Sequence, residues 1–225
     1  MNGLARVRLL QMTSQAFPIG GYSHSYGLEA AVESALVRDE ASLRQWIIDV
    51  LSYSIGKYEI PLLHQMSEAW IARDSMGLSR LNERFLATRE SAEMRSATVQ
   101  TGFSMRSLLA VLPELPDFLQ DTLRRLQEPS LPCVWSGAAA AWAIPAAESA
   151  AGYLWSWAEN QVLAGMKTVP IGQSAGQRVL LTIGEYIAEL TGREPSIDDD
   201  LSNFAPGLAI QCARHETQYS RLFRS

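Results

Sequence analysis

SGAAAAWAIPAAESAAGYLWSWAENQVLAGM, residues 136–166, is rich in alanine, glycine and serine, with large apolar side chains spaced among them. Small side chains allow the backbones of neighbouring helices to approach closely. Large side chains provide the apolar area that a central helix buries, and here they are Trp142, Tyr153, Leu154, Trp155 and Trp157. We therefore predict that this stretch forms the central helices of the protein.

Helical periodicity continues on both sides of this stretch. Apolar residues at positions 28, 31, 32, 35 and 36 form one stripe, and similar stripes predict helices over 42–54, 61–70, 78–112, 118–126 and 172–190. Ser42 and Gln45 have the spacing of a capping box, and Pro61 suits the start of a helix. No alternating β-branched run with hairpin signals occurs. The pattern predicts an all-α, single-domain bundle of about eight to ten helices with no significant sheet.

The domain is expected to cover residues 1–225, because no internal repeat or low-complexity linker divides the chain. The polar stretch near 193–207 is the best candidate for a flexible loop. The last residues, 212–225, combine arginines with Tyr219, Leu222 and Phe223. Side chains of these types are enriched at protein interfaces, so we interpret this segment as an interaction tail.

Bulk composition excludes several classes of protein. The formal net charge is −5 and no basic stripe is interleaved with aromatic residues, which disfavours nucleic acid as a partner. Two cysteines without CxxC spacing suit a reducing cytoplasm, and the first residues lack the pattern of a signal peptide. The uncharged stretch 129–147 contains three prolines and is mostly alanine, so we predict a buried helix there and no membrane span.

The stretch FPIGGYSHSYGLEAAVE, residues 17–33, is the first candidate for chemistry. Gly21 to Ser25 begin like a nucleophile elbow, but the second glycine and the preceding strand are missing. A small helical hydrolase using Ser23 and His24 remains the alternative hypothesis. The three histidines, at positions 24, 64 and 215, have no metal-site spacing. A labile surface site remains open only if His24 or His215 lies near a partner.

The stretch GMKTVPIGQSAGQR, residues 165–178, contains glycines and a lysine but not the P-loop order, because Lys167 precedes the glycines. Nucleotide binding by this chain alone is therefore not expected. Lys167 and Lys57 are the only lysines beside seventeen arginines, so a specific role for Lys167 is plausible.

Together, FPIGGYSHSYGLE, AGMKTVPIGQSAGQR and ARHETQYSRLFRS resemble the urease accessory protein UreF family in order and spacing across nearly the whole chain. The resemblance implies an all-α, cytoplasmic homodimer that binds the accessory protein UreD, also called UreH. That pair would recruit the GTPase UreG and deliver nickel to apo-urease as a metallochaperone complex. It also implies no enzyme activity, no cofactor, and no catalytic or metal-binding residues in this chain.

By position, the resemblance makes Glu29 and Lys167 the first candidates for a surface that the GTPase contacts, and both are expected to be exposed. The tail is expected to be mobile until a partner binds, with Arg221 donating to an acceptor such as the GGYSHSYG turn. The full set of expected partner-binding residues is Tyr22, Ser23, His24, Glu29, Lys167, Gln173, Gln177, Arg178, His215, Glu216, Tyr219 and Arg221.

Overall fold

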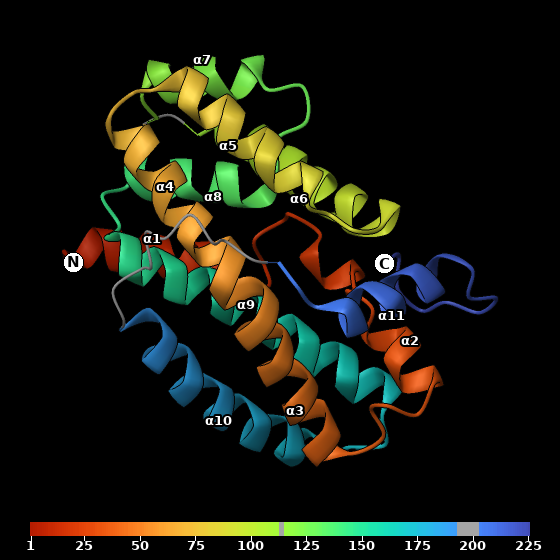
Figure 1. Ribbon diagram of the computed structural model, residues 1–225. Coiled ribbons are helices and arrows are strands. Elements are labelled where there is room, and N and C mark those ends of the chain that lie inside the picture. Colours follow the sequence, from red (N-terminus) through yellow and green to blue (C-terminus); the bar gives the residue numbers. More distant parts are fainter. Residues whose placement is uncertain (113–114, 193–202) are drawn as a thin grey trace.

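The computed structural model describes residues 1–112, 115–192 and 203–225, and within these ranges it contains helices and no strand (Figure 1). Because α3 and α4 are joined without interruption, the eleven α-helical elements form ten separate helices. The predicted all-α bundle is thereby confirmed. The elements are α1 (Gly3–Thr13), η1 (Gly21–Ser23), α2 (Leu28–Glu33), α3 (Glu40–Val50), η2 (Leu51–Glu59), α4 (Ile60–Ile71), α5 (Ser75–Ala87), α6 (Ala92–Ala110), α7 (Asp117–Arg125), α8 (Leu131–Ala141), α9 (Ala146–Thr168), α10 (Gln173–Thr191) and α11 (Pro206–Glu216).

The stretch 136–166 lies at the centre, as predicted. Helix α9 packs against α10, α1, α2 and α3, while α8 packs against α4 and α6. Glycine is required where these helices touch: a Cβ on Gly165 would lie 2.5 Å from Leu43 Cδ2, and one on Gly152 would lie 2.6 Å from Leu9 Cδ1. The small residues therefore set how closely α3 and α1 approach α9.

Helices α3 and α4 form one long rod through a π-helical segment, η2. The sequence instead predicted a new helix opening at Pro61. The widened π turns precede this proline, which has no N–H to donate to the helix before it. Ser54, Tyr58 and Glu59 of η2 are buried as a result.

The start of α3 also differs from the prediction. Asp39, and not Ser42, is the N-cap residue: its side chain accepts from the Ser42 N–H at 2.8 Å, and Ser42 is the third helical residue of the capping box. The predicted pair Ser42 and Gln45 is wrong by one turn, because Gln45 instead donates to Asp49 at 2.8 Å.

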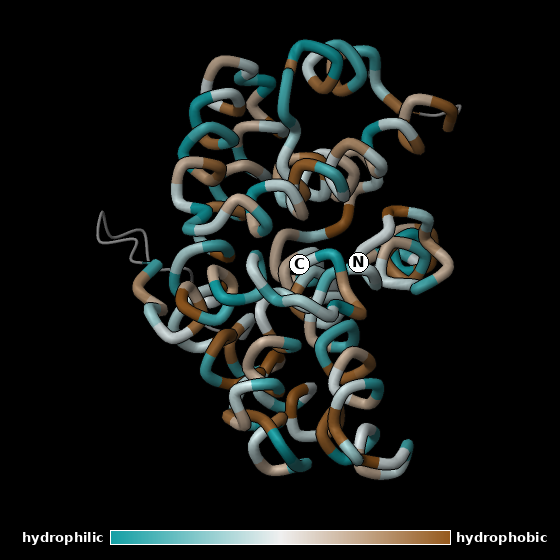
Figure 2. The backbone as a smooth tube through the Cα atoms, turned by 90° about the vertical axis from the view of Figure 1, so that its right-hand side faces the viewer, coloured by the Kyte–Doolittle hydropathy of each residue, from teal (hydrophilic) through white to brown (hydrophobic). Residues whose placement is uncertain are grey.

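The first and the last helix, α1 and α11, differ in how they pack against the rest of the bundle. Figure 2 shows α1 at one edge, and its outward residues Leu4, Val7 and Leu10 are exposed. Helix α11 packs against α2 and α6, and the C-terminal residues run beside α2 (Figure 1).

Most of the predicted loop 193–207 lies outside the described residues, and α11 begins at Pro206. Among the described helices, none combines the length and apolarity that crossing a membrane requires.

Candidate partner-binding surface

The turn before α2 contains three residues with a left-handed backbone. Gly20 has φ 77°, Tyr26 φ 51° and Gly27 φ 80°. Glycine adopts these angles at little cost, and Gly27 has a second constraint because a Cβ there would lie 2.9 Å from Cys212 Sγ on α11. The turn is thus shaped to let α11 approach α2.

The part of the C-terminal segment that follows α11, residues 217–225, is called the tail from here on, and it is bound to this turn. The Ser25 and Tyr26 N–H groups both donate to the main-chain oxygen of Ser225, the latter at 3.0 Å, and the Arg224 N–H donates to Ser23 O at 2.8 Å. His24 Nδ1 lies 2.7 Å from Ser225 Oγ. The many hydrogen-bonding groups of the turn are therefore largely occupied by the end of the same chain.

Helix α9 also binds the turn, through two side-chain hydrogen bonds. Asn160 Nδ2 donates to His24 O at 2.8 Å, and Gln161 Nε2 donates to Ser25 O at 2.9 Å. Because buried main-chain carbonyl groups need hydrogen-bond donors, these bonds help to satisfy the carbonyl groups of His24 and Ser25. The turn is therefore connected to the central helix as well as to the tail.

Glu29 is buried, not exposed as predicted, with 8% of its surface accessible. Its carboxylate accepts from the Leu222 N–H at 2.6 Å, from the Phe223 N–H at 3.0 Å and from His215 Nε2 at 3.1 Å. A buried carboxylate is stable only when it is paired and hydrogen-bonded. The residues that satisfy it lie near the other end of the sequence, so the local helical pattern could not indicate its burial.

His215 continues this network to α6. Its Nδ1 lies 2.6 Å from Glu93 Oε2, and Arg221 Nη1 lies 2.7 Å from Glu93 Oε1. Both ring nitrogens of His215 face carboxylate oxygens, and both can donate only in the imidazolium state. The hydrogen-bonded series Glu29–His215–Glu93–Arg221 joins α2, α11, α6 and the tail.

Two predictions about the tail are corrected by these contacts. Arg221 bonds to Glu93, and the turn instead receives the tail through main-chain groups and Ser225. The tail also has a packed position without a partner protein, because Phe223 and Ser225 are buried. Glu93 was not predicted as a site residue, since it lies in the charged middle of the chain, where nothing in the local pattern distinguishes it.

Lys167, at the end of α9, meets the same tail. Its ammonium lies 5.6 Å from the centre of the Phe223 ring, within the range of a cation–π contact. Lys167 itself is exposed, as predicted. Glu29 and Lys167 therefore both act on Phe223, one through its backbone and the other through its ring.

Side chains of the turn, of α11 and of the tail itself form an exposed rim. Tyr22 and Leu222 are exposed by 62% and 64%, Tyr219 is fully exposed, and Glu216 is exposed as well. We call Tyr22, Lys167, Tyr219, Arg221 and Leu222 the turn–tail surface. It brings together three segments that are far apart in the sequence.

The remaining predicted residues of the second motif are placed on α10. Gln173 and Gln177 are exposed in its first turns, and Arg178 forms a two-pronged ion pair with Glu40 of α3, with Nε 3.0 Å from Oε1. Arg178 therefore links α10 to α3 and is not bound to the tail.

The alternative serine–histidine hypothesis finds no support in the geometry. Ser23 Oγ donates to Gly20 O at 2.7 Å, while the His24 ring contacts Ser225. Burial, and to a smaller extent the nearby positive charge of Arg224, lower the pKa of His24 to about 4. His24 and His215 are both buried and hydrogen-bonded, and the described residues contain no cluster of three or more potential metal ligands.

Comparison with known proteins agrees with the resemblance of the three motifs. A sequence profile of the UreF family matches residues 37–184. A urease accessory protein UreF of Dechloromonas aromatica is 50% identical over 224 residues, covering 99% of this chain and 98% of that protein. The corresponding proteins of an Azoarcus species and a Janthinobacterium species are 49% and 43% identical, covering 99% and 100% of this chain and 96% and 100% of those proteins. This chain therefore belongs to the UreF family of urease accessory proteins.

Proposed function

We propose that this protein is a non-enzymatic assembly factor for urease. It would act in the cytoplasm as a homodimer, bind a UreD-type accessory protein, and with it recruit and regulate a UreG-type GTPase while nickel is inserted into apo-urease. The observation that carries the proposal is the turn–tail surface, where segments from the three motifs contact one another and carry exposed side chains.

The polar groups beneath this surface favour a binding role over catalysis. Glu29, His215 and Glu93 are used to hold one another and the tail. A nucleophile and its base need to face a position where a substrate can sit, whereas Glu29 and His215 are buried and Glu93 is half-buried under the chain itself. Their arrangement makes a rigid platform from which Tyr219, Leu222 and Arg221 project.

The composition of the rim fits contact with another protein. Tyrosine and arginine are enriched among residues that contribute most to binding at interfaces. Lys167 and Arg221 place positive charge on this face of an otherwise acidic protein. Such charges orient a partner with an acidic patch and speed its association more than they strengthen the final complex.

A matched pair of tyrosine variants tests the proposal. Tyr219→Ala removes a fully exposed ring from the turn–tail surface, while Tyr53→Ala removes a 55% exposed ring from η2. In pull-down of the UreD-type protein and the UreG-type GTPase, we expect Tyr219→Ala to weaken assembly at least tenfold and Tyr53→Ala to have a smaller effect. Both variants should keep the helical circular dichroism of the parent protein.

Nickel-dependent activation of apo-urease in the reconstituted mixture gives the functional readout. It should decrease with Tyr219→Ala in proportion to the loss of assembly. Normal assembly and activation by Tyr219→Ala, Arg221→Ala and Lys167→Ala alike would show that partners bind elsewhere.

A further inference from the structure

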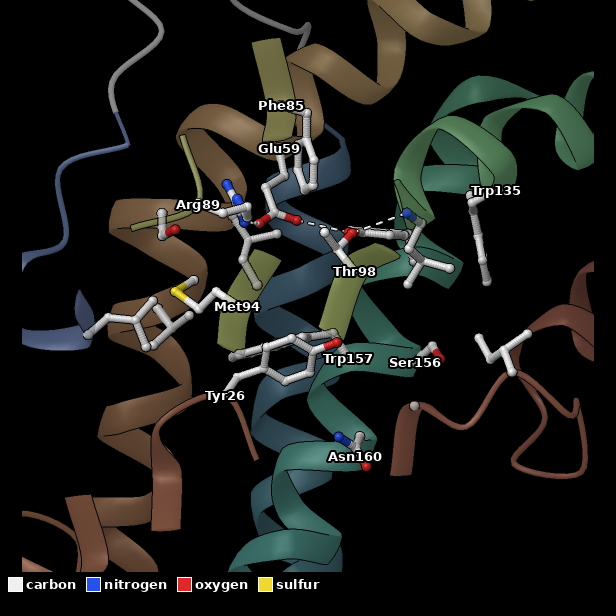
Figure 3. Close-up of a pocket in the computed structure, with 18 residues that line it drawn as sticks. Tyr26, Glu59, Phe85, Arg89, Met94, Thr98, Trp135, Ser156, Trp157 and Asn160 are labelled. Atoms are coloured by element: carbon white, nitrogen blue, oxygen red, sulfur yellow. Dashed lines mark hydrogen bonds and ion pairs between the residues drawn. The ribbon is translucent and has the colours of Figure 1, made fainter. Parts of the chain in front are cut away.

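A partly open cavity of about 80 Å³ is lined by residues of the turn and of η2, α6, α8 and α9, among others (Figure 3). The aromatic residues Phe85, Trp135, Tyr153 and Trp157 are among those that line it. One wall carries a buried ion pair, in which Arg89 Nη1 lies 2.6 Å from Glu59 Oε1. The Glu59 side chain is at the end of the π-helical segment, a type of structure that often occurs at functional sites.

The ion pair leaves one strong donor unused. Glu59 Oε2 accepts from the Tyr153 hydroxyl at 2.8 Å, so both oxygens of the carboxylate are engaged. Among the described residues, however, Arg89 Nε is buried without a hydrogen-bond partner, and only 4% of the Arg89 side chain is exposed. An unpaired buried N–H group of a guanidinium is costly, so the cavity has room and a donor for an additional acceptor.

The charges around the cavity restrict what that acceptor can be. The Arg89 guanidinium and the Glu59 carboxylate compensate one another, so the site as a whole requires no further charge. Burial, and then the Glu59 carboxylate, raise the pKa of Tyr26 and of Tyr153 well above the ordinary value, which keeps both phenols protonated. An added anion would be repelled by the same carboxylate, and an added cation by Arg89.

We propose that this cavity is a binding site for a small, neutral, planar carbonyl compound of the amide class. Its carbonyl oxygen accepts from Arg89 Nε, its flat face lies among the aromatic rings, and its N–H groups meet the oxygen atoms of the lining polar residues. Molecules of four to six heavy atoms match the volume.

The cavity has a neighbouring hollow that reaches exposed residues. A second hollow of about 50 Å³ shares Ile19, Gly21, Ser156 and Asn160 with the cavity and extends to the exposed residues Gln15 and Tyr22. Tyr26, which lines the cavity, has a φ of 51° and also donates its N–H to the main-chain oxygen of Ser225. A molecule in the cavity would therefore contact a residue that supports the tail, and its binding would stabilise the turn–tail surface.

Acetamide and acetate provide the first test, because they have the same shape and differ in charge. Saturation-transfer NMR on the full-length protein at pH 7 should show saturable binding of acetamide in the millimolar range. Four heavy atoms limit the dissociation constant to no tighter than about 40 µM. Acetate should bind at least tenfold more weakly. The proposal would be overturned if acetate bound as tightly as acetamide or more tightly. It would also be overturned if acetamide showed no saturable binding, in which case ordered water would be the occupant of the cavity.

Arginine-to-lysine variants provide the second test. Arg89→Lys retains the positive charge beside Glu59 and removes Nε, so it should weaken acetamide binding at least tenfold. Arg95→Lys is the matched control, since Arg95 forms an exposed pair with Glu128 and does not line the cavity. An equal loss in both variants would refute the assignment of the site.

If Arg89→Lys fails to fold, Tyr26→Phe decides the question, because it removes one oxygen and keeps the ring. Acetamide affinity should then decrease at least threefold, and an unchanged affinity would exclude the proposed site. None of these measurements depends on urease or on the accessory partners.

Discussion

Glu29 is expected from the sequence to lie on the surface, but in the structure its side chain is buried. Its carboxylate is satisfied by two tail N–H groups and by His215, so burial removes it from water without leaving an unpaired charge. Lys167 contacts the same tail but keeps its ammonium in solvent. The two candidates that the sequence treated as equivalent therefore differ in their contribution to folding.

Glu29→Ala is expected to lower the free energy of unfolding by about 3 kcal/mol, because it leaves buried donors without an acceptor. Lys167→Ala should cost less than about 1 kcal/mol, since it removes only an exposed cation–π contact. Chemical denaturation followed by circular dichroism measures both values. Equal stability of the two variants would contradict the observed network.

A pH dependence follows from His24. Its pKa in the folded protein is about 4, below the ordinary value of 6.5, so the unfolded chain binds a proton that the folded chain does not between these values. Stability should therefore decrease as the pH falls from about 6.5 to about 4. His64, whose pKa burial also lowers, contributes in the same direction.

His24→Asn separates the two contributions. The asparagine amide can still contact Ser225 but does not titrate, so the loss of stability between pH 6.5 and 4 should be smaller than in the parent protein. Unfolding free energies measured across this range test the prediction. A profile identical to that of the parent protein would assign the dependence to other groups.

At the scale of elements, the tail behaves as a part of the fold. Phe223 is buried against the bundle while its neighbour Leu222 is 64% exposed. Phe223→Ala should therefore cost about 3 kcal/mol of unfolding free energy, and Leu222→Ala less than about 1 kcal/mol. Urea denaturation compares them directly, and similar losses in both would show that the tail does not pack as described.

Truncation of residues 216–225 should destabilise the protein on the same grounds. Because the truncation removes Phe223 and the donors to Glu29, the melting temperature should decrease. For that reason point variants in the exposed rim test partner binding better than a truncation does.

The packing of α9 leads to a further comparison between glycines in helix interiors. A Cβ on Gly165 would meet the buried Leu43 at 2.5 Å, whereas one on Gly184 of α10 would have its nearest neighbour, Trp155 Cζ3, at 3.6 Å. Gly165→Ala should destabilise the protein by about 1–3 kcal/mol. Gly184→Ala should be neutral or stabilising by up to about 1 kcal/mol. Thermal melting distinguishes them, and the reverse order would refute the close packing of α3 on α9.

At the scale of the whole molecule, the proposed function requires that nucleotide and metal bind through partners. The sequence lacks a P-loop, and the described residues contain no cluster of three or more metal ligands. Isothermal titration of the purified chain should therefore show no sub-micromolar site for GTP or for Ni²⁺. A one-to-one sub-micromolar isotherm with either would mean that this chain takes part directly in the chemistry.

The sequence determined most of the helical elements and the central place of 136–166, but it predicted neither α1 nor α11, and the single helix expected over 78–112 is divided into α5 and α6. Apolar periodicity and the small residues of 136–166 act over windows of ten to thirty residues, so a single sequence carries this information. Its motifs also indicated the family, and the family comparison confirms that assignment. Local pattern was less reliable at boundaries, as the capping box at Asp39 and the continuous helix through Pro61 show.

Only the tertiary structure decided which charges are buried and what holds them. Glu29 depends on residues 215, 222 and 223, and Glu59 depends on Arg89 and Tyr153. These partners lie between 30 and 194 positions away along the chain. No local spacing encodes such pairs, because whether a carboxylate can leave water depends on which donors the fold brings to it. The sequence thus specified the helices, and their packing specified the chemistry of the surface and of the cavity.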